Sequence, residues 1–243
     1  MHLTSFFNGR TLAALVISQV SVFLAVRYNI IFNLDLTLFG LAIAFPLAFS
    51  IQAAFKRRER ALEYFSLFKG GSIALLSSFR MAEDLSEEKK MEAKKALEDM
   101  SNQLVSQLKN QEGDYAPLQT KIDSVLAFIE RNREEISNRN VLRMIRYVRD
   151  VSESSSYLMS LVRHRTMAGL RFYAILFILI FPAVQAPIIL FRLQGVASLA
   201  VIYILIAISS AMLVTLSNFQ TWIEYPFDPK GIDNIRVDDF KLV

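Results

Sequence analysis

The sequence predicts an all-α membrane protein in which four transmembrane helices are interrupted by a cytoplasmic helical insertion between the second and third spans. The chain of 243 residues is 53% hydrophobic yet 21% charged, so its apolar and polar parts are segregated along the sequence. Helices and closed barrels are the only structures that cross a bilayer, and an apolar segment of about 20 residues is the length a spanning helix needs. We therefore expect helices.

Four apolar segments of that length occur, at residues 11–32, 36–55, 170–191 and 196–216. Arg10 and the first apolar run resemble a signal peptide, but no small-residue cleavage site follows, so we interpret the run as a retained span. Tyr173 lies near the entrance of the third span, where aromatic residues anchor helices at the interface. Gln19, Gln185, Ser209 and Ser210 are expected to hydrogen-bond between helices.

The polar insertion, residues 56–165, begins and ends with basic clusters. By the positive-inside rule it lies in the cytoplasm, together with both termini, and a bacterial inner membrane is the expected location. The predicted parts are residues 1–55, 56–165, 166–220 and a cytoplasmic tail, 221–243.

Hydrophobic periodicity predicts three helices within the insertion after the second span has continued into water. The first covers residues 81–110, with an apolar stripe at Leu85, Leu97, Met100, Leu104 and Leu108. Pro117 is suited to open the second helix. The third covers residues 141–162, with Leu142, Ile145, Val148 and Val151 assigned to one face.

The second span carries the most informative pattern, Phe45-Pro46-Leu47-Ala48-Phe49 followed by Gln52. A proline within a span survives where neighbouring helices or waters satisfy the freed carbonyl, and apolar constrictions gate some channels by drying. Packing of Phe45 and Phe49 between helices is the alternative. Lys56, Arg57, Arg58 and Arg60 follow the span as a stop-transfer flank; they could also contact anionic lipid or concentrate anions near a pore.

Several motifs in a fixed order resemble the bestrophin family of ion channels. The F-P-L-A-F run is similar to the family's proline-led neck, and Arg60-Ala61-Leu62-Glu63 stands where the family has R-W-W-E. Val162-Arg163-His164-Arg165-Thr166 resembles the basic entry to the third span, and Ile223-Glu224-Tyr225-Pro226-Phe227 resembles the N-P-F motif after the fourth.

The resemblance implies a homopentamer with a central pore, conducting inorganic ions, with anions such as chloride favoured. By position, the neck residues are Phe45, Phe49 and Ala53, which recur every four residues and share a helix face. Ala53 is smaller than the family's usual residue, so Gln52 or Phe55 is the alternative for the lower constriction.

The C-terminal tail holds four aspartates, Asp228, Asp233, Asp238 and Asp239. Oxygen-rich loops suit calcium, and an acidic stretch at this place binds calcium in some bestrophins. The alternative is a tail that docks on a neighbouring subunit through Phe227 and Ile235.

No enzyme is predicted, because the sequence has no cysteine, only two histidines and no phosphate-binding loop or nucleophile elbow. Calcium is the single cofactor considered, and membrane lipid is a partner while nucleic acid is not. The competing function is a non-conducting, membrane-anchored helical scaffold whose insertion binds a protein partner. A secondary transporter is disfavoured because no charged residue lies in the central part of a span.

Overall fold

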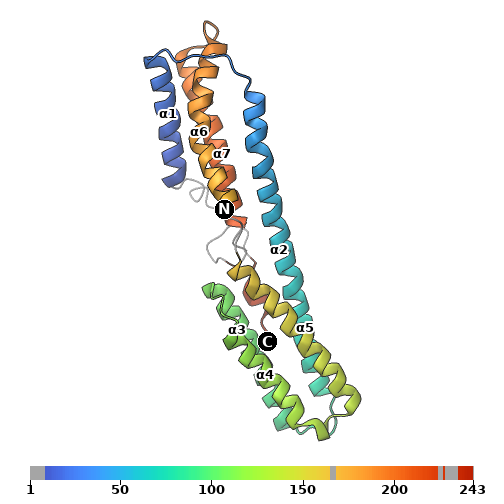
Figure 1. Ribbon diagram of the computed structural model, residues 1–243. Helices are drawn as coiled ribbons and strands as arrows, with labels where there is room; N and C mark the ends of the chain where they lie inside the picture. Colours follow the sequence, from blue (N-terminus) through green and yellow to red (C-terminus); the bar gives the residue numbers. More distant parts are fainter. Residues whose placement is uncertain (1–8, 165–167, 224–226, 228–234, 243) are drawn as a thin grey trace. The chain divides into compact units, whose positions relative to one another are not determined.

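A computed structural model of the chain describes residues 9–164, 168–223, 227 and 235–242. Every regular element in this part of the chain is helical, which confirms the all-α prediction. The elements, labelled in Figure 1, are α1 (Gly9–Arg27), α2 (Leu36–Arg80), α3 (Glu87–Asn110), α4 (Ala116–Arg131), η2 (Arg133–Glu135), α5 (Asn138–Arg163), α6 (Ala168–Leu193), α7 (Leu199–Ile223) and η3 (Val237–Phe240).

The chain divides into two compact units. The apolar unit comprises Met1–Phe55 and Thr166–Glu224, and the insertion unit comprises Lys56–Arg165 and Tyr225–Val243. Helix α2 contributes its first part to the apolar unit and its second part to the insertion unit.

In the apolar unit, α1, α6 and α7 pack side by side (Figure 1). Their common core contains Val22, Ala25, Ala186, Ile202 and Ile206, and the two alanines let the helix backbones approach closely. Gln19 Nε2 donates to the carbonyl of Tyr203 at 3.4 Å, and Ser209 Oγ donates to Gln185 Oε1 at 2.7 Å. These are the expected interhelical hydrogen bonds, whereas Ser210 Oγ is buried without a partner among the described residues.

Among the residues that the structure describes, three helices are long and apolar enough to cross a membrane, at Gly9–Arg27, Ile175–Leu193 and Leu199–Ile223. They support a membrane protein. The 36–55 part of α2 is not among the three, so the four-span count remains a prediction.

The first helix is shorter than the apolar run at residues 11–32 suggested. It ends at Arg27, and Asn29 adopts a left-handed conformation with φ of 51°. The amide of Ile30 donates to the carbonyl of Ala25 at 2.9 Å, and the amide of Asn29 donates to the carbonyl of Val26 at 3.3 Å. This pair of bonds is a Schellman motif, which ends a helix whatever the hydrophobicity beyond it.

The insertion unit is built around one hydrophobic core that includes the predicted stripe of Leu85, Leu97, Met100, Leu104 and Leu108, all buried. Helix α3 begins at Glu87 rather than near residue 81, because Ser86 caps it and accepts from the amide of Lys89 at 3.4 Å. Pro117 lies in the first turn of α4, as predicted.

The face assigned to α5 was correct for Val148 and Val151 and wrong for Leu142 and Ile145. Leu142 and Ile145 are 70% and 43% exposed, while Val141, Met144, Val148 and Val151 are buried. When four residues are each three positions apart, the last lies on the opposite side of the helix from the first. Residues whose spacing alternates between three and four positions stay on the side that faces the core.

The tail residues that the structure describes belong to the insertion unit. Phe227, Ile235 and Val237 are buried in its core. The Phe65 ring stacks on Phe240, with centroids 4.4 Å apart, and meets Phe227 edge-on at 5.8 Å. The expected docking of Phe227 and Ile235 on a neighbouring subunit is therefore corrected: their binding surface is in the same chain.

Candidate functional site

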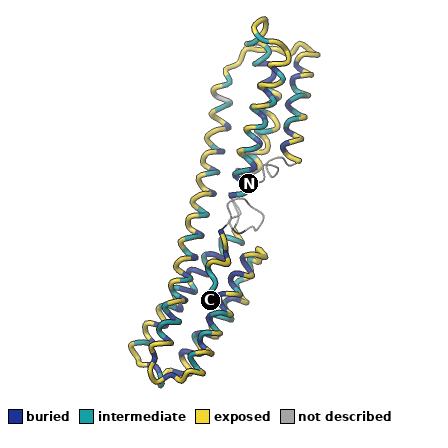
Figure 2. Tube along the Cα trace, turned by 180° about the vertical axis from the view of Figure 1, so that it is seen from behind, coloured by how far each residue is buried: buried dark blue, intermediate teal, exposed yellow. Residues whose placement is uncertain are grey.

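Helix α2 presents two different faces within the apolar unit. Ile43, Leu47, Ser50 and Ala54 are buried by the unit's other helices. Phe45 and Phe49, by contrast, are 56% and 64% exposed. Gln52 and Ala53 are also exposed, and Figure 2 shows this alternation of burial along the helix. The predicted neck residues thus share the side of α2 that its own chain leaves uncovered.

The Phe45 and Phe49 rings lie one above the other, with centroids 6.3 Å apart and an interplanar angle of 20°. Phe55 points elsewhere: its ring meets that of Phe219 on α7 edge-on, with centroids 6.3 Å apart. Among the two alternatives for a lower constriction, Gln52 is therefore on the uncovered side, while Phe55 contacts a helix of its own unit.

Pro46 lies inside α2, where it removes one hydrogen bond of the helix. Because proline has no amide hydrogen, the carbonyl four residues earlier, that of Ala42, loses its donor within the helix. The hydroxyl of Tyr173 on α6 donates to this carbonyl at 2.9 Å. A side chain from a neighbouring helix thus satisfies the carbonyl that the proline frees.

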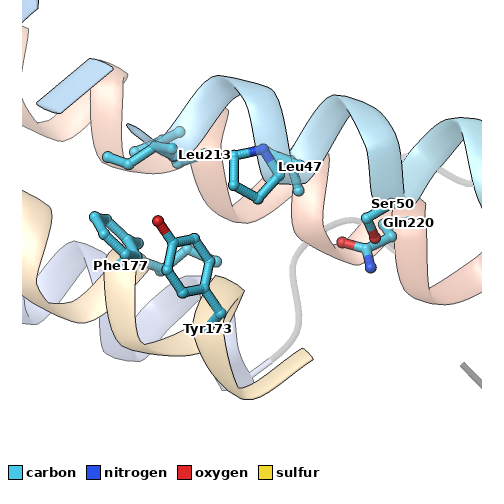
Figure 3. A pocket seen from close by; sticks show the side chains of 9 residues that line it. Leu47, Ser50, Tyr173, Phe177, Leu213 and Gln220 are labelled. Carbon is cyan, nitrogen blue, oxygen red and sulfur yellow. The ribbon is translucent and has the colours of Figure 1, made fainter. Parts of the chain in front are cut away.

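Behind this face lies a small pocket between α2, α6 and α7, lined by Ile43, Pro46, Leu47, Ser50, Tyr173, Phe177, Ile178, Leu213 and Gln220 (Figure 3). Its free volume is about 10 Å³, room for roughly one water molecule. Ser50 Oγ is buried without a hydrogen-bond partner among the described residues, and Figure 3 shows it beside Gln220. The buried side of the neck segment is therefore closely packed.

The basic residues that follow the second span do not all make the same kind of contact. Arg57 donates to the carbonyl of Leu161 and, at 2.8 Å, to that of His164, so it caps the C-terminal end of α5. Arg60 lies 3.4 Å from the hydroxyl of Tyr157, whose ring stacks on Tyr64 with centroids 3.8 Å apart. Lys56 is exposed and Arg58 is half-buried.

The described part of the tail carries Asp238 and Asp239, whereas Asp228 and Asp233 lie outside the described residues. Lys109 Nζ and Lys241 Nζ donate to the two carboxylate oxygens of Asp238, at 2.6 and 2.8 Å. Hydrogen bonds from these lysines lower the pKa of Asp238 below its usual range. Lys69 Nζ donates to the main-chain carbonyl of Asp239 at 2.6 Å.

Asp238 is thus neutralised by lysines rather than grouped with other acids. Within the described part of the chain, no group of three or more histidine, aspartate or glutamate residues could hold a metal ion. A calcium-binding tail remains a prediction.

Sequence reasoning missed the role of Tyr173, which it interpreted only as an interfacial anchor. The proline at position 46 does signal that the Ala42 carbonyl needs a donor. The donor comes from a residue 131 positions away, and such a pairing depends on how α2 and α6 pack.

No protein-family model matches the chain, and the search of curated proteins found no match. Solved structures do match. A bacterial bestrophin homologue from Klebsiella pneumoniae is 14% identical, with a TM-score of 0.75, and the match covers 95% of this chain and 93% of the homologue. A point variant of that homologue gives a TM-score of 0.77 at the same identity and coverage.

A further structure described as a membrane protein is 13% identical, with a TM-score of 0.76 over 95% of this chain and 92% of its own. The regular structure of the described residues is all helical, and the apolar helices support a membrane protein. Its fold is that of the bacterial bestrophin homologues, as the motifs in the sequence indicated.

Proposed function

We propose that this protein is an oligomeric ion channel of the bestrophin type, in which the uncovered side of α2 lines an apolar neck. The observation that carries the proposal is the contrast between the two faces of α2. One face is packed against the protein's own helices, while Phe45 and Phe49 remain more than half exposed.

The chemistry of this face favours a water-filled passage over lipid. Gln52 lies on it, and a side-chain amide in hydrocarbon without a partner is costly. Phe45, Phe49 and Ala53 form an apolar row at a spacing of four residues. Copies of this row around one axis make a narrow ring that opens by widening or wetting.

The surrounding assembly follows from the same resemblance. Four spans, five copies, a cytoplasmic insertion and cytoplasmic termini in a bacterial inner membrane are the arrangement we propose, with the parts 1–55, 56–165, 166–220 and 221–243. Chloride or a similar anion is the permeant ion. Lys56 supports this choice, because an exposed cation three residues beyond Ala53 raises the local anion concentration.

The test is chloride flux through purified protein in liposomes, comparing the natural chain with Phe49→Ala and Phe45→Ala. We expect each alanine variant to raise flux severalfold, because removing a ring widens the constriction and weakens its drying. Phe23→Ala is the matched control. Phe23 is a phenylalanine of α1 with 58% exposure, and its removal leaves flux unchanged.

Flux that stays at the background of empty liposomes for every variant, with the protein folded and inserted, would contradict the proposal. The function would then be the membrane-anchored scaffold. An equal increase for Phe23→Ala would show that the two α2 phenylalanines have no special place at the constriction.

A further inference from the structure

We propose that Tyr173 is a positioning residue of the neck, holding α2 at Pro46 through its hydrogen bond to the carbonyl of Ala42. The inference rests on the proposed function for its effect on flux. The hydrogen bond itself is independent of that function.

The first step concerns the defect that Pro46 makes in α2. Proline removes the amide hydrogen that would bond the Ala42 carbonyl, and its ring crowds that carbonyl, so helices bend at such sites. The defect lies one residue from Phe45 and three residues from Phe49. Any change in the bend at Pro46 therefore moves the phenylalanine rings of the neck.

The second step concerns the donor. Tyr173 Oη donates to the Ala42 carbonyl at 2.9 Å, and the Tyr173 ring packs against that of Phe177 with centroids 4.4 Å apart. Both aromatic residues line the same pocket as Pro46 and Leu47, and Figure 3 shows them on the side of α6. The contact with Phe177 and the hydrogen bond to Ala42 thus hold the Tyr173 side chain from two sides.

The third step concerns the free energy of the hydrogen bond. The Tyr173 hydroxyl supplies the hydrogen bond that α2 itself cannot give the Ala42 carbonyl, and losing such a bond costs free energy. The bend that keeps Ala42 within reach of Tyr173 is therefore preferred over bends that release it. Tyr173 thereby selects one position of the neck residues without being part of the row that faces the passage.

The experiment is a double-mutant cycle of Tyr173→Phe with Pro46→Ala, measured by chloride flux in liposomes and by the midpoint of thermal unfolding. Tyr173→Phe removes only the hydroxyl. Pro46→Ala restores an amide hydrogen that bonds the Ala42 carbonyl within α2, so the Tyr173 hydroxyl becomes unnecessary.

In the natural chain, we expect Tyr173→Phe to change flux by about fivefold, the factor that one hydrogen bond contributes to an equilibrium. The unfolding midpoint should fall by about 2 to 4 °C. In the Pro46→Ala background, both effects of Tyr173→Phe should vanish. Tyr203→Phe, which alters a tyrosine whose hydroxyl is not at the proline, is the control and leaves flux unchanged in both backgrounds.

Equal effects of Tyr173→Phe in the two backgrounds would overturn the inference. Coupling in the unfolding midpoint together with coupling in flux supports it fully. Coupling in the unfolding midpoint without flux from any variant, the natural chain included, would support the hydrogen bond while contradicting the channel. If the two substitutions are coupled in the unfolding midpoint but Tyr173→Phe leaves the flux unchanged, the positioning role would be overturned.

Discussion

Gly71 lies on α2 at a point where a side chain would collide with α5. A Cβ atom at this position would meet Val151 Cγ2 at 2.9 Å and the carbonyl oxygen of Tyr147 at 3.6 Å. The neighbouring Gly70 has nothing within 4 Å of such an atom. A Cβ atom therefore has no room at Gly71 but meets no neighbouring atom at Gly70.

We expect Gly70→Ala to stabilise the protein by about 0.5 to 1 kcal/mol, because alanine loses less backbone entropy in a helix. Gly71→Ala should instead destabilise it by about 1 to 3 kcal/mol, since Val151 is β-branched and its methyl group cannot rotate away freely. Thermal unfolding of the two variants in one detergent checks the difference. Equal midpoints would contradict the close approach of α2 and α5.

At the scale of elements, ion pairs link the docked tail to the rest of the insertion unit. Asp238 forms ion pairs with Lys109 and Lys241, while Phe240 stacks on Phe65. Because the pKa of Asp238 is lowered in the folded protein, its contribution is present above the unfolded value of about 3.9. The contribution is lost as the pH falls through the folded pKa.

Acid should therefore loosen the tail. Hydrogen exchange of residues 235–242, corrected for intrinsic rates, should rise between pH 5 and pH 3 in the natural chain. Asp238→Asn should exchange faster already at pH 7 and respond less to acid, whereas Asp239→Asn should behave as the natural chain does. An identical acid response in all three proteins would show that the Asp238 ion pairs do not hold the tail.

Helix α5 illustrates how an element is predicted correctly while its orientation is not. Its amphipathic pattern indicated a helix at residues 141–162, and the structure has one at Asn138–Arg163. The choice between Leu142 and Met144 as core residues, however, depends on which side meets α2, α3 and α4. Periodicity defines a face only to within one residue when apolar side chains flank it.

At the scale of the whole molecule, the question is whether copies of α2 converge. The chain has no cysteine, so a single introduced cysteine reports on one position. We expect Phe49→Cys to give cross-linked dimers with a short bis-maleimide, because the uncovered face of every copy lines the same axis in the proposed ring and each copy carries one thiol. Leu47→Cys, at a position only 7% exposed, should give none.

A cross-linked dimer band is the result expected for Phe49→Cys in membranes, because each thiol forms one thioether bond and so joins a copy to one neighbour. Cross-linking of Leu47→Cys to the same extent, or an uncross-linked Phe49→Cys protein that reacts fully with maleimide, would contradict the ring.

The sequence by itself determined the helical class, the apolar segments and the place of Pro117 at the start of α4. These features are local: they follow from composition, hydrophobic period and turn chemistry over a few neighbouring residues. The family whose fold the chain shares was indicated by the resemblance of several motifs in a fixed order. The assignment of Phe45, Phe49, Gln52 and Ala53 to a neck came from the resemblance to the bestrophin family, and it stays a prediction.

Tertiary structure alone decided which side of α2 is buried, which carbonyls Arg57 caps, that Tyr173 completes the helix at Pro46, and that the tail packs on its own chain. Each of these depends on contacts between residues far apart in the sequence, such as Lys109 with Asp238. Hydrophobic pattern gives a segment its preference for burial, but the partner that buries it is chosen by the packing of the whole fold.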